Sequence, residues 1–334
     1  MMKKNLIAAA ALLAVAGAAN AQMTIYGLID VSYGKSLYSD LIGDTKATFH
    51  SGGDNSSSEG NSTTRLGFKG STDLGGGMKA NFKLETSGIK SDGDKNGALF
   101  GRQMWAGFSG NFGEVRLGRQ EAVPYQIMGD FDFNGQSNGV SAGAYTGVGA
   151  WARSRQSRSL QYMTPNMGGL SAQFGFVPKG NGEESDKSVF SAAVKYAAGP
   201  LLVGAAMQSK NDSSAKNFSS VAASYDFGVA KVMASYANGG RILNDNFTSG
   251  GGSGKGYVLG VVAPVAGWSI GAHYARQSES LVKTTAWELF ANKEIFKNTY
   301  GYIEFGDWKN STDGGEGVVK TKAQGYAAGV IFVF

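Results

Sequence analysis

Alternation of apolar and polar residues recurs along almost the whole chain, and it constrains the fold more than any other feature of the sequence. It is clear in Thr24 to Tyr33, in Met78 to Glu85 and in Gly113 to Gln120, where aliphatic or aromatic residues tend to occupy alternate positions. A period of two places successive side chains on opposite faces of an extended strand. Helical spacing is sustained nowhere. The sequence therefore predicts an all-β protein.

The segment from Tyr326 to Phe334 ends the sequence on an aromatic ring. The residues of one parity form an apolar face: Tyr326, Ala328, Val330, Phe332 and Phe334. Chain ends of soluble domains usually fray into water, whereas the last strand of a closed transmembrane barrel must pair with the first. The segment therefore favours a barrel in a lipid bilayer, and a buried C-terminal strand of a soluble protein is the alternative.

The N-terminus has the three parts of a secretory signal peptide. Lys3 and Lys4 form the positive region, Leu6 to Gly17 is an apolar run, and Ala19 to Ala21 fits a small-x-small cleavage site. The run of about a dozen residues is shorter than the ~20 that a spanning helix needs, which weighs against the alternative of a membrane anchor. We therefore predict that residues 1–21 are a cleaved signal peptide and that residues 22–334 form one barrel domain.

Composition excludes several other classes of protein. The chain has no cysteine, 51 glycines and only 5 prolines among 334 residues, which excludes a small disulfide-rich module and favours a large hydrogen-bonded sheet. Of the 31 basic residues, Lys3 and Lys4 lie in the leader, which leaves 29 against 26 acidic residues. This balance is too weak to indicate a nucleic-acid partner. A mean hydropathy of −0.18 suits a barrel with a wet interior, because only alternate residues face lipid.

Short turns and long polar loops alternate along the sequence. The short turns include Asp73 to Gly77, Gly110 to Gly113, Pro165 to Gly169, Ala198 to Pro200, Asp226 to Gly228 and Pro264 to Gly267. The long loops are Leu37 to Asn61, Ser91 to Leu99, Glu121 to Ser154, Lys179 to Lys187, Gly239 to Lys255 and Lys309 to Lys320. This asymmetry is typical of outer-membrane barrels, and the segments between the turns number about sixteen, an even count as such barrels have. Aromatic residues near strand ends, such as Tyr26, Trp105 and Trp308, are expected in interfacial girdles.

Several motifs carry a family resemblance, and they lie in order along nearly the whole mature chain. The longest is R-Q-M-W-A-G-F-S-G-N-F-G-E-V-R-L-G-R-Q, from Arg102 to Gln120. Others are I-Y-G-L-I-D from Ile25 to Asp30, R-L-G-F-K-G from Arg65 to Gly70 and S-L-Q-Y-M-T-P from Ser159 to Pro165. Together with the terminal Phe334, these motifs resemble the general porins of Gram-negative bacteria, and most of all their β-proteobacterial type.

The resemblance implies a 16-stranded antiparallel transmembrane β-barrel, a homotrimer and a third loop that folds into the lumen. It implies a location in the outer membrane, with lipid and lipopolysaccharide around the barrel. It also implies that the terminal strand with Phe334 is recognised by the outer-membrane assembly machinery.

Strand parity selects the first candidates for the lumen. If Leu66 and Phe68 face lipid, Arg65 faces the lumen, and if Trp105 faces lipid, Arg102 faces the lumen. An arginine at mid-membrane on the lipid face would cost about 2–4 kcal/mol, so both arginines are expected to point inward.

The resemblance implies that Arg65 and Arg102 form the basic side of a pore constriction together with a third basic residue. Arg155 matches that third position best, and Arg153 or Arg158 could take its place because the alignment slips easily there. Strand alternation adds Lys83 and Arg116 as further lumen candidates. The opposing acidic side is expected in the third loop, and its candidates are Asp130, Asp132 and Glu121.

The sequence offers little for chemistry. His50 and His273 are the two histidines, and neither has the spacing of a zinc site. Ser269 shares the parity of His273, but nothing else marks it as a nucleophile. We therefore predict no metal, no cofactor and no enzymatic activity.

The predicted function is a passive diffusion channel for small hydrophilic solutes and ions. Arginines that face carboxylates across a narrow lumen create a transverse field, which low-dielectric walls focus and which favours small anions. The alternatives are a solute-specific porin, a plugged barrel that acts as an adhesin or phage receptor, and a barrel hydrolase.

Overall fold

The computed structural model describes residues 22–136, 138–148, 154–180, 187–210, 216–240, 253–315 and 317–334. The predicted signal peptide, residues 1–21, and the candidate Arg153 lie outside the described residues. Among the described residues, no helix has the length and apolar character that crossing a membrane would require.

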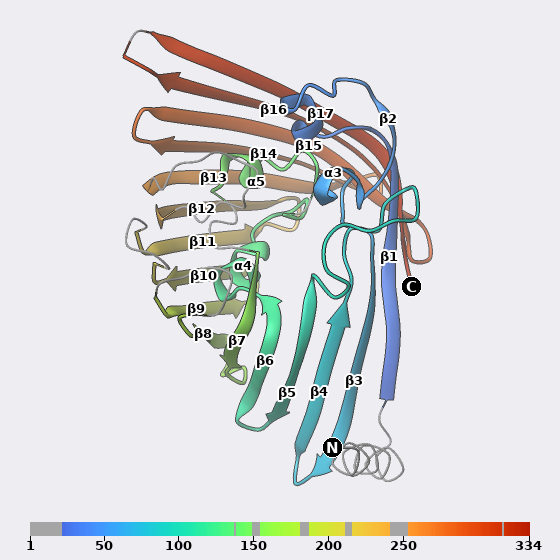
Figure 1. Ribbon diagram of the computed structural model, residues 1–334, viewed down its shortest axis with the longest axis vertical. Coiled ribbons are helices and arrows are strands. Elements are labelled where there is room, and N and C mark those ends of the chain that lie inside the picture. Colours follow the sequence, from blue (N-terminus) through green and yellow to red (C-terminus); the bar gives the residue numbers. More distant parts are fainter. Residues whose placement is uncertain are drawn as a thin grey trace.

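One antiparallel sheet forms the wall of the molecule and closes on itself (Figure 1). Its strands are β1 (Gln22–Lys35), β3 (Arg65–Gly75), β4 (Met78–Glu85), β5 (Gln103–Gly110), β6 (Gly113–Glu121), β7 (Arg155–Met163), β8 (Leu170–Val177), β9 (Val189–Ala198), β10 (Leu201–Gln208), β11 (Phe218–Asp226), β12 (Lys231–Gly240), β13 (Ser253–Val265), β14 (Trp268–Glu279), β15 (Val282–Phe296), β16 (Thr299–Asp313) and β17 (Val318–Val333). Among the described residues the sheet has 17 strands, and the four-residue β2 (Thr48–Ser51) only extends the first long loop along β1. The remaining strands are the sixteen of the predicted barrel.

The barrel closes between its first and last strands. β1 pairs with β17 from Leu28↔Val333 to Lys35↔Tyr326. Beyond the strand, Phe334 N donates to the Gly27 carbonyl at 3.1 Å and the Phe334 carbonyl accepts from Gly27 N at 2.9 Å. The terminal strand therefore has backbone partners along its whole length, as the closed barrel requires.

The two faces of the wall follow the alternation of the sequence. Large apolar side chains such as Leu117, Phe190 and Ile303 are exposed on the outer face. Polar side chains such as Gln161, Gln277 and Glu288 are buried on the inner face. An apolar outer band around a polar interior is the pattern of a barrel whose solvent is lipid on the outside.

Three predicted girdle aromatics lie on the inner face instead. Tyr26 donates its hydroxyl to Glu85 Oε2 at 2.7 Å, Trp105 is only 9% exposed, and Trp308 Nε1 donates to the Tyr145 carbonyl at 2.9 Å. Each ring therefore packs among polar or loop groups of the lumen. A second difference concerns the last long loop, because β16 continues to Asp313 and β17 begins at Val318.

In the described part of the loops there are four short helices: α2 (Leu37–Leu41) and α3 (Asp54–Ser57) in the first, and α4 (Val123–Gly129) and α5 (Ala142–Thr146) in the third. α4 packs Val123 and Ile127 against Ala193 and Ala206, which lie on the inner face of β9 and β10. Gly204 makes room for this contact, since a Cβ there would lie 2.8 Å from the Phe131 ring.

The second half of the third loop contacts a part of the inner face that comes later in the strand order. Ala142 of α5 and Val148 share an apolar cluster with Val258, Ala275 and Ala286 of β13, β14 and β15. The two helices therefore rest against β9–β10 and β14–β15.

Candidate functional site

Three predicted arginines lie around two carboxylates on the inner face, and we call these five residues the arginine cluster: Arg65, Arg102, Arg155, Glu85 and Glu121. Arg102 Nε is 2.6 Å from Glu85 Oε1, and Arg102 Nη2 is 3.9 Å from Glu121 Oε1. Arg155 Nη2 is also 3.9 Å from Glu121 Oε1. Arg65 interacts electrostatically with Arg102, Glu85 and Glu121, and its Nη1 donates to the Thr63 carbonyl at 3.2 Å.

Strand register explains most of this arrangement. Glu121 at the end of β6 lies directly opposite Arg155 at the start of β7. On β3 and β4, Gly67 lies opposite Glu85, which leaves Arg65 one inward position away along its strand. Regular alternation therefore places Arg65 and Glu85 on one face of the wall, whereas Glu121 and Arg155 pair beyond the register shift between Gly118 and Gln120.

Arg102 points inward for a different reason from the predicted one. The prediction required Trp105 to face lipid, but Met104 is 58% exposed on the outer face and Trp105 faces the lumen. Arg102 lies in the bend before β5, where the alternation of the strand does not yet apply. Its side chain points toward Glu85, although the parity of β5 would place it on the outer face.

Tyr26 and Glu85 are the members of this region that the prediction missed. The Tyr26 ring lies across Gly67, where a Cβ would come within 2.3 Å of the ring. Its hydroxyl shares Glu85 with Arg102 and with Lys83, whose Nζ is 3.3 Å from Glu85 Oε2. Glu85 has the same parity as Lys83, so the alternation of β4 did contain the signal for its inward position.

The other basic candidates divide into two groups. Lys83 and Arg116 lie on the inner face as predicted, with Arg116 Nη2 2.7 Å from Glu114 Oε2 and its guanidinium carbon 4.2 Å from the Trp105 ring centre. Arg158 is exposed and has the parity of Leu160, an outer-face residue, so strand parity does not support a lumen position for it. The register of β6 and β7 shifts between Gly118 and Gln120, and Arg158 has a φ of 51° at this irregularity.

The predicted acidic side does not form an open row that faces the arginines. Glu121 belongs to the arginine cluster itself. Asp130 follows α4, and its Oδ2 lies 2.7 Å from Lys195 Nζ on β9. Asp132 lies 3.7 Å from His273 Nδ1 on β14, with a side chain that is only 10% exposed. Each loop carboxylate therefore has a basic partner on the wall.

A buried polar cluster holds the third loop at this point. His273 Nδ1 makes a close contact with Glu288 Oε1, and His273 Nε2 accepts from Phe133 N at 3.4 Å. Nearby, Asn61 Nδ2 donates to Asn134 Oδ1 at 2.9 Å and to Glu304 Oε2 at 3.0 Å. The first loop, the third loop and the wall are thus joined through side chains that the sequence analysis did not connect.

Comparisons with known proteins agree with this architecture. A family model described as Gram-negative porin matches residues 8–313. Outer membrane porin protein 32 of Delftia acidovorans is 31% identical over 326 residues, which cover 90% of this chain and 85% of the relative. An outer membrane porin protein of Bordetella pertussis is 30% identical over 297 residues, which cover 79% and 74% of the two chains. The solved structure of an anion-selective porin from Comamonas acidovorans superposes with a TM-score of 0.74 at 26% identity, covering 94% of this chain and 100% of that one.

Proposed function

This chain belongs to the Gram-negative porin family, and from that premise we propose that its channel prefers small anions because the arginine cluster is not balanced by acidic groups. The protein is an outer-membrane porin with a sixteen-stranded barrel. The proposal concerns what sets the preference among the solutes that pass, and we further propose that the barrel carries out no chemical reaction.

The charge balance around Glu85 and Glu121 is the observation that carries the proposal. Four cationic side chains surround two carboxylates: Arg65, Arg102, Arg155 and Lys83 around Glu85 and Glu121. Of the loop acids, Asp130 is paired with Lys195, and Asp132 lies beside His273, which also contacts Glu288. A net positive potential between low-dielectric walls concentrates anions and repels cations.

We propose that the third loop supplies the other side of the narrow region. The contacts of α4 with β9–β10 and of α5 with β14–β15 support a loop that lies within the lumen. In this arrangement the third loop narrows the lumen by the space that it fills. The charged groups that set the anion preference lie on the wall of the barrel.

Assembly follows the same reasoning from family membership. We propose a homotrimer surrounded by outer-membrane lipid and lipopolysaccharide, and a terminal strand that the assembly machinery recognises through Phe334. Conductance that closes in groups of three equal steps would support the trimer, and isolated single steps would contradict it.

Reversal potentials in a planar bilayer under a KCl gradient test the selectivity. In the variant Arg65→Ala with Arg102→Ala, the anion preference of the wild type is expected to fall by about tenfold or more, because two of the four cations around Glu85 and Glu121 are lost. Lys320→Ala, on the exposed part of β17, removes one positive charge far from the cluster and serves as the control. Equal reversal potentials for the wild type and the double variant would overturn the assignment.

A further inference from the structure

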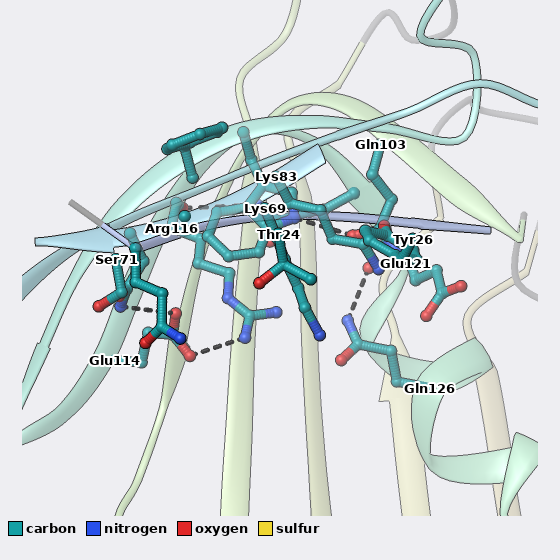
Figure 2. Close-up of a pocket in the computed structure, with 16 residues that line it drawn as sticks. Thr24, Tyr26, Lys69, Ser71, Lys83, Gln103, Glu114, Arg116, Glu121 and Gln126 are labelled. Atoms are coloured by element: carbon teal, nitrogen blue, oxygen red, sulfur yellow. Dashed lines mark hydrogen bonds and ion pairs between the residues drawn. The ribbon is translucent and has the colours of Figure 1, made fainter. Parts of the chain in front are cut away.

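A recess of about 660 Å³ lies on the inner face of β1 and β3–β6 (Figure 2). Its lining includes Thr24, Lys69, Ser71, Lys83 and Arg116, and Gln126 of α4 approaches from the loop side. Lys69 is four residues beyond Arg65 on β3, which corresponds to about 13 Å along the strand. This direction leads toward the short turn between β3 and β4, so the recess lies in series with the arginine cluster along the pore.

Two lysines face each other in this recess, although their like charges repel. Lys69 on β3 lies directly opposite Lys83 on β4, and like charges at such positions destabilise a sheet. Both Nζ atoms lie over the Tyr26 ring, at 5.2 Å and 5.5 Å from its centre. The ring relieves part of the repulsion, but it does not neutralise either charge.

Within the described residues, only one of the two lysines has a carboxylate partner. Lys83 is paired with Glu85, and Arg116 is paired with Glu114. In the part of the chain that the structure describes, no carboxylate forms an ion pair with Lys69, and its side chain is exposed to the lumen. Lys69 therefore presents a full positive charge to a passing solute.

Two hydroxyl groups lie beside Lys69, and neither has a side-chain partner in the described part of the chain. Thr24 lies directly opposite it on β1, and Ser71 lies two residues further along the same face of β3. Among the described residues, neither hydroxyl makes a side-chain hydrogen bond. One ammonium group with two available hydroxyls matches a solute that carries a carboxylate next to hydroxyl groups.

We propose that Lys69, Thr24 and Ser71 form a binding station for small hydroxylated carboxylates on the short-turn side of the arginine cluster. Lys69 binds the carboxylate, the two hydroxyls bind the solute hydroxyls, and Lys83 adds to the local positive potential. The station rests on the proposed anion preference and adds to it a chemical class of solute that stays longer in the pore.

Gluconate is the probe, and blockade of single-channel chloride current is the measurement. Gluconate is expected to block at lower concentration than butyrate, which lacks the hydroxyls, or glucose, which lacks the charge. Lys69→Gln should raise the half-blocking concentration of gluconate about threefold or more, as for the loss of one solvated ion pair. Thr24→Val should raise it about twofold, through one lost hydrogen bond.

Two controls separate the station from the general charge of the lumen. Lys69→Arg keeps the charge and should retain the blockade, and Lys320→Gln makes the same charge change on the outer face of β17 and should leave it unchanged. The KCl reversal potential of the same channels tests the proposed function independently. If the channel prefers anions but gluconate and butyrate show no Lys69-dependent difference in blockade, the station alone is overturned. If the wild-type channel shows no anion preference, the proposed function is overturned.

Discussion

Glu85 determines how much positive charge the arginine cluster presents to the lumen. It accepts contacts from Arg102 at 2.6 Å, from Lys83 at 3.3 Å and from the Tyr26 hydroxyl at 2.7 Å. A single carboxylate thus positions two cations and partly neutralises both. The selectivity of the channel depends on this balance as much as on the number of arginines.

Replacing Glu85 by glutamine is therefore expected to increase the anion preference. The change removes one of two cluster carboxylates and keeps the side-chain volume, so the ratio of chloride to potassium permeability should rise about twofold. Reversal potentials provide the measurement, with Asp313→Asn in the exposed hairpin as the control of equal charge change. A decrease in anion preference in Glu85→Gln would contradict the role given to this residue.

At the scale of elements, the third loop is held to the wall at two kinds of contact. Asp130 and Lys195 form a partly exposed ion pair, with side chains 39% and 33% exposed. His273 is buried between Glu288 of the wall and Asp132 and Phe133 of the loop. Buried hydrogen-bonded groups contribute more to stability than exposed ion pairs, so His273 is expected to dominate the attachment.

Removing the imidazole tests this difference. His273→Ala leaves Glu288 buried without its partner, and we expect a loss of about 2–3 kcal/mol together with larger fluctuations of the open-channel current. Lys195→Gln should cost at most about 1 kcal/mol and change the current noise little. Thermal unfolding followed by gel mobility and single-channel recording measure the two effects. Equal effects of the two variants would show that the buried cluster does not hold the loop.

The first loop is attached to the last strand through Asp40 of α2. Burial opposes ionisation of this carboxyl, but the ammonium group of Lys35 at 2.6 Å and the N–H of Gln324 at 2.8 Å hold its pKa below the usual value. A lowered pKa in the folded state adds stability above the ordinary carboxyl pKa of about 3.9, and this stability is lost as the pH falls through the folded value.

The attachment should therefore weaken in acid. Asp40→Asn is expected to reduce stability by roughly 1 kcal/mol at neutral pH and to differ little from the wild type once the pH falls below the lowered pKa of Asp40. Protease sensitivity of the first loop across this pH range measures the difference. If the difference in protease sensitivity between wild type and variant persists at low pH, ionisation of Asp40 is not its cause.

At the scale of the whole molecule, the barrel depends on the contact between its two ends. The Phe334 ring covers Gly27, where a Cβ would lie 2.6 Å from the ring, and the two backbones exchange hydrogen bonds. Phe334→Ala is expected to reduce the yield of folded trimer in the outer membrane severalfold, whereas Phe332→Ala, which keeps the terminal ring, should reduce it much less. Heat-modifiable mobility of the two variants on gels decides between them, and equal yields would contradict a special role of Phe334.

The alternation of the sequence predicted the barrel and the inward position of most candidates, because register and parity are local properties of regular strands. It gave the wrong face for Trp105, because β5 alternates regularly with Met104 on the outer face, and it is not reliable at Arg158, where the register between β6 and β7 shifts. The partners of Asp130 and Asp132 could not be predicted, since Lys195 and His273 are far away in the sequence and meet these acids only through the packing of the third loop.

The central claim is that unbalanced positive charge in the lumen selects for anions. The reversal potential of the wild-type channel in a planar bilayer under a steep KCl gradient tests it most directly. The account predicts a potential with the sign of the chloride equilibrium potential, which shrinks toward zero as salt screens the arginine cluster. A reversal potential of zero at low salt, or one with the sign of the potassium equilibrium potential, would contradict it.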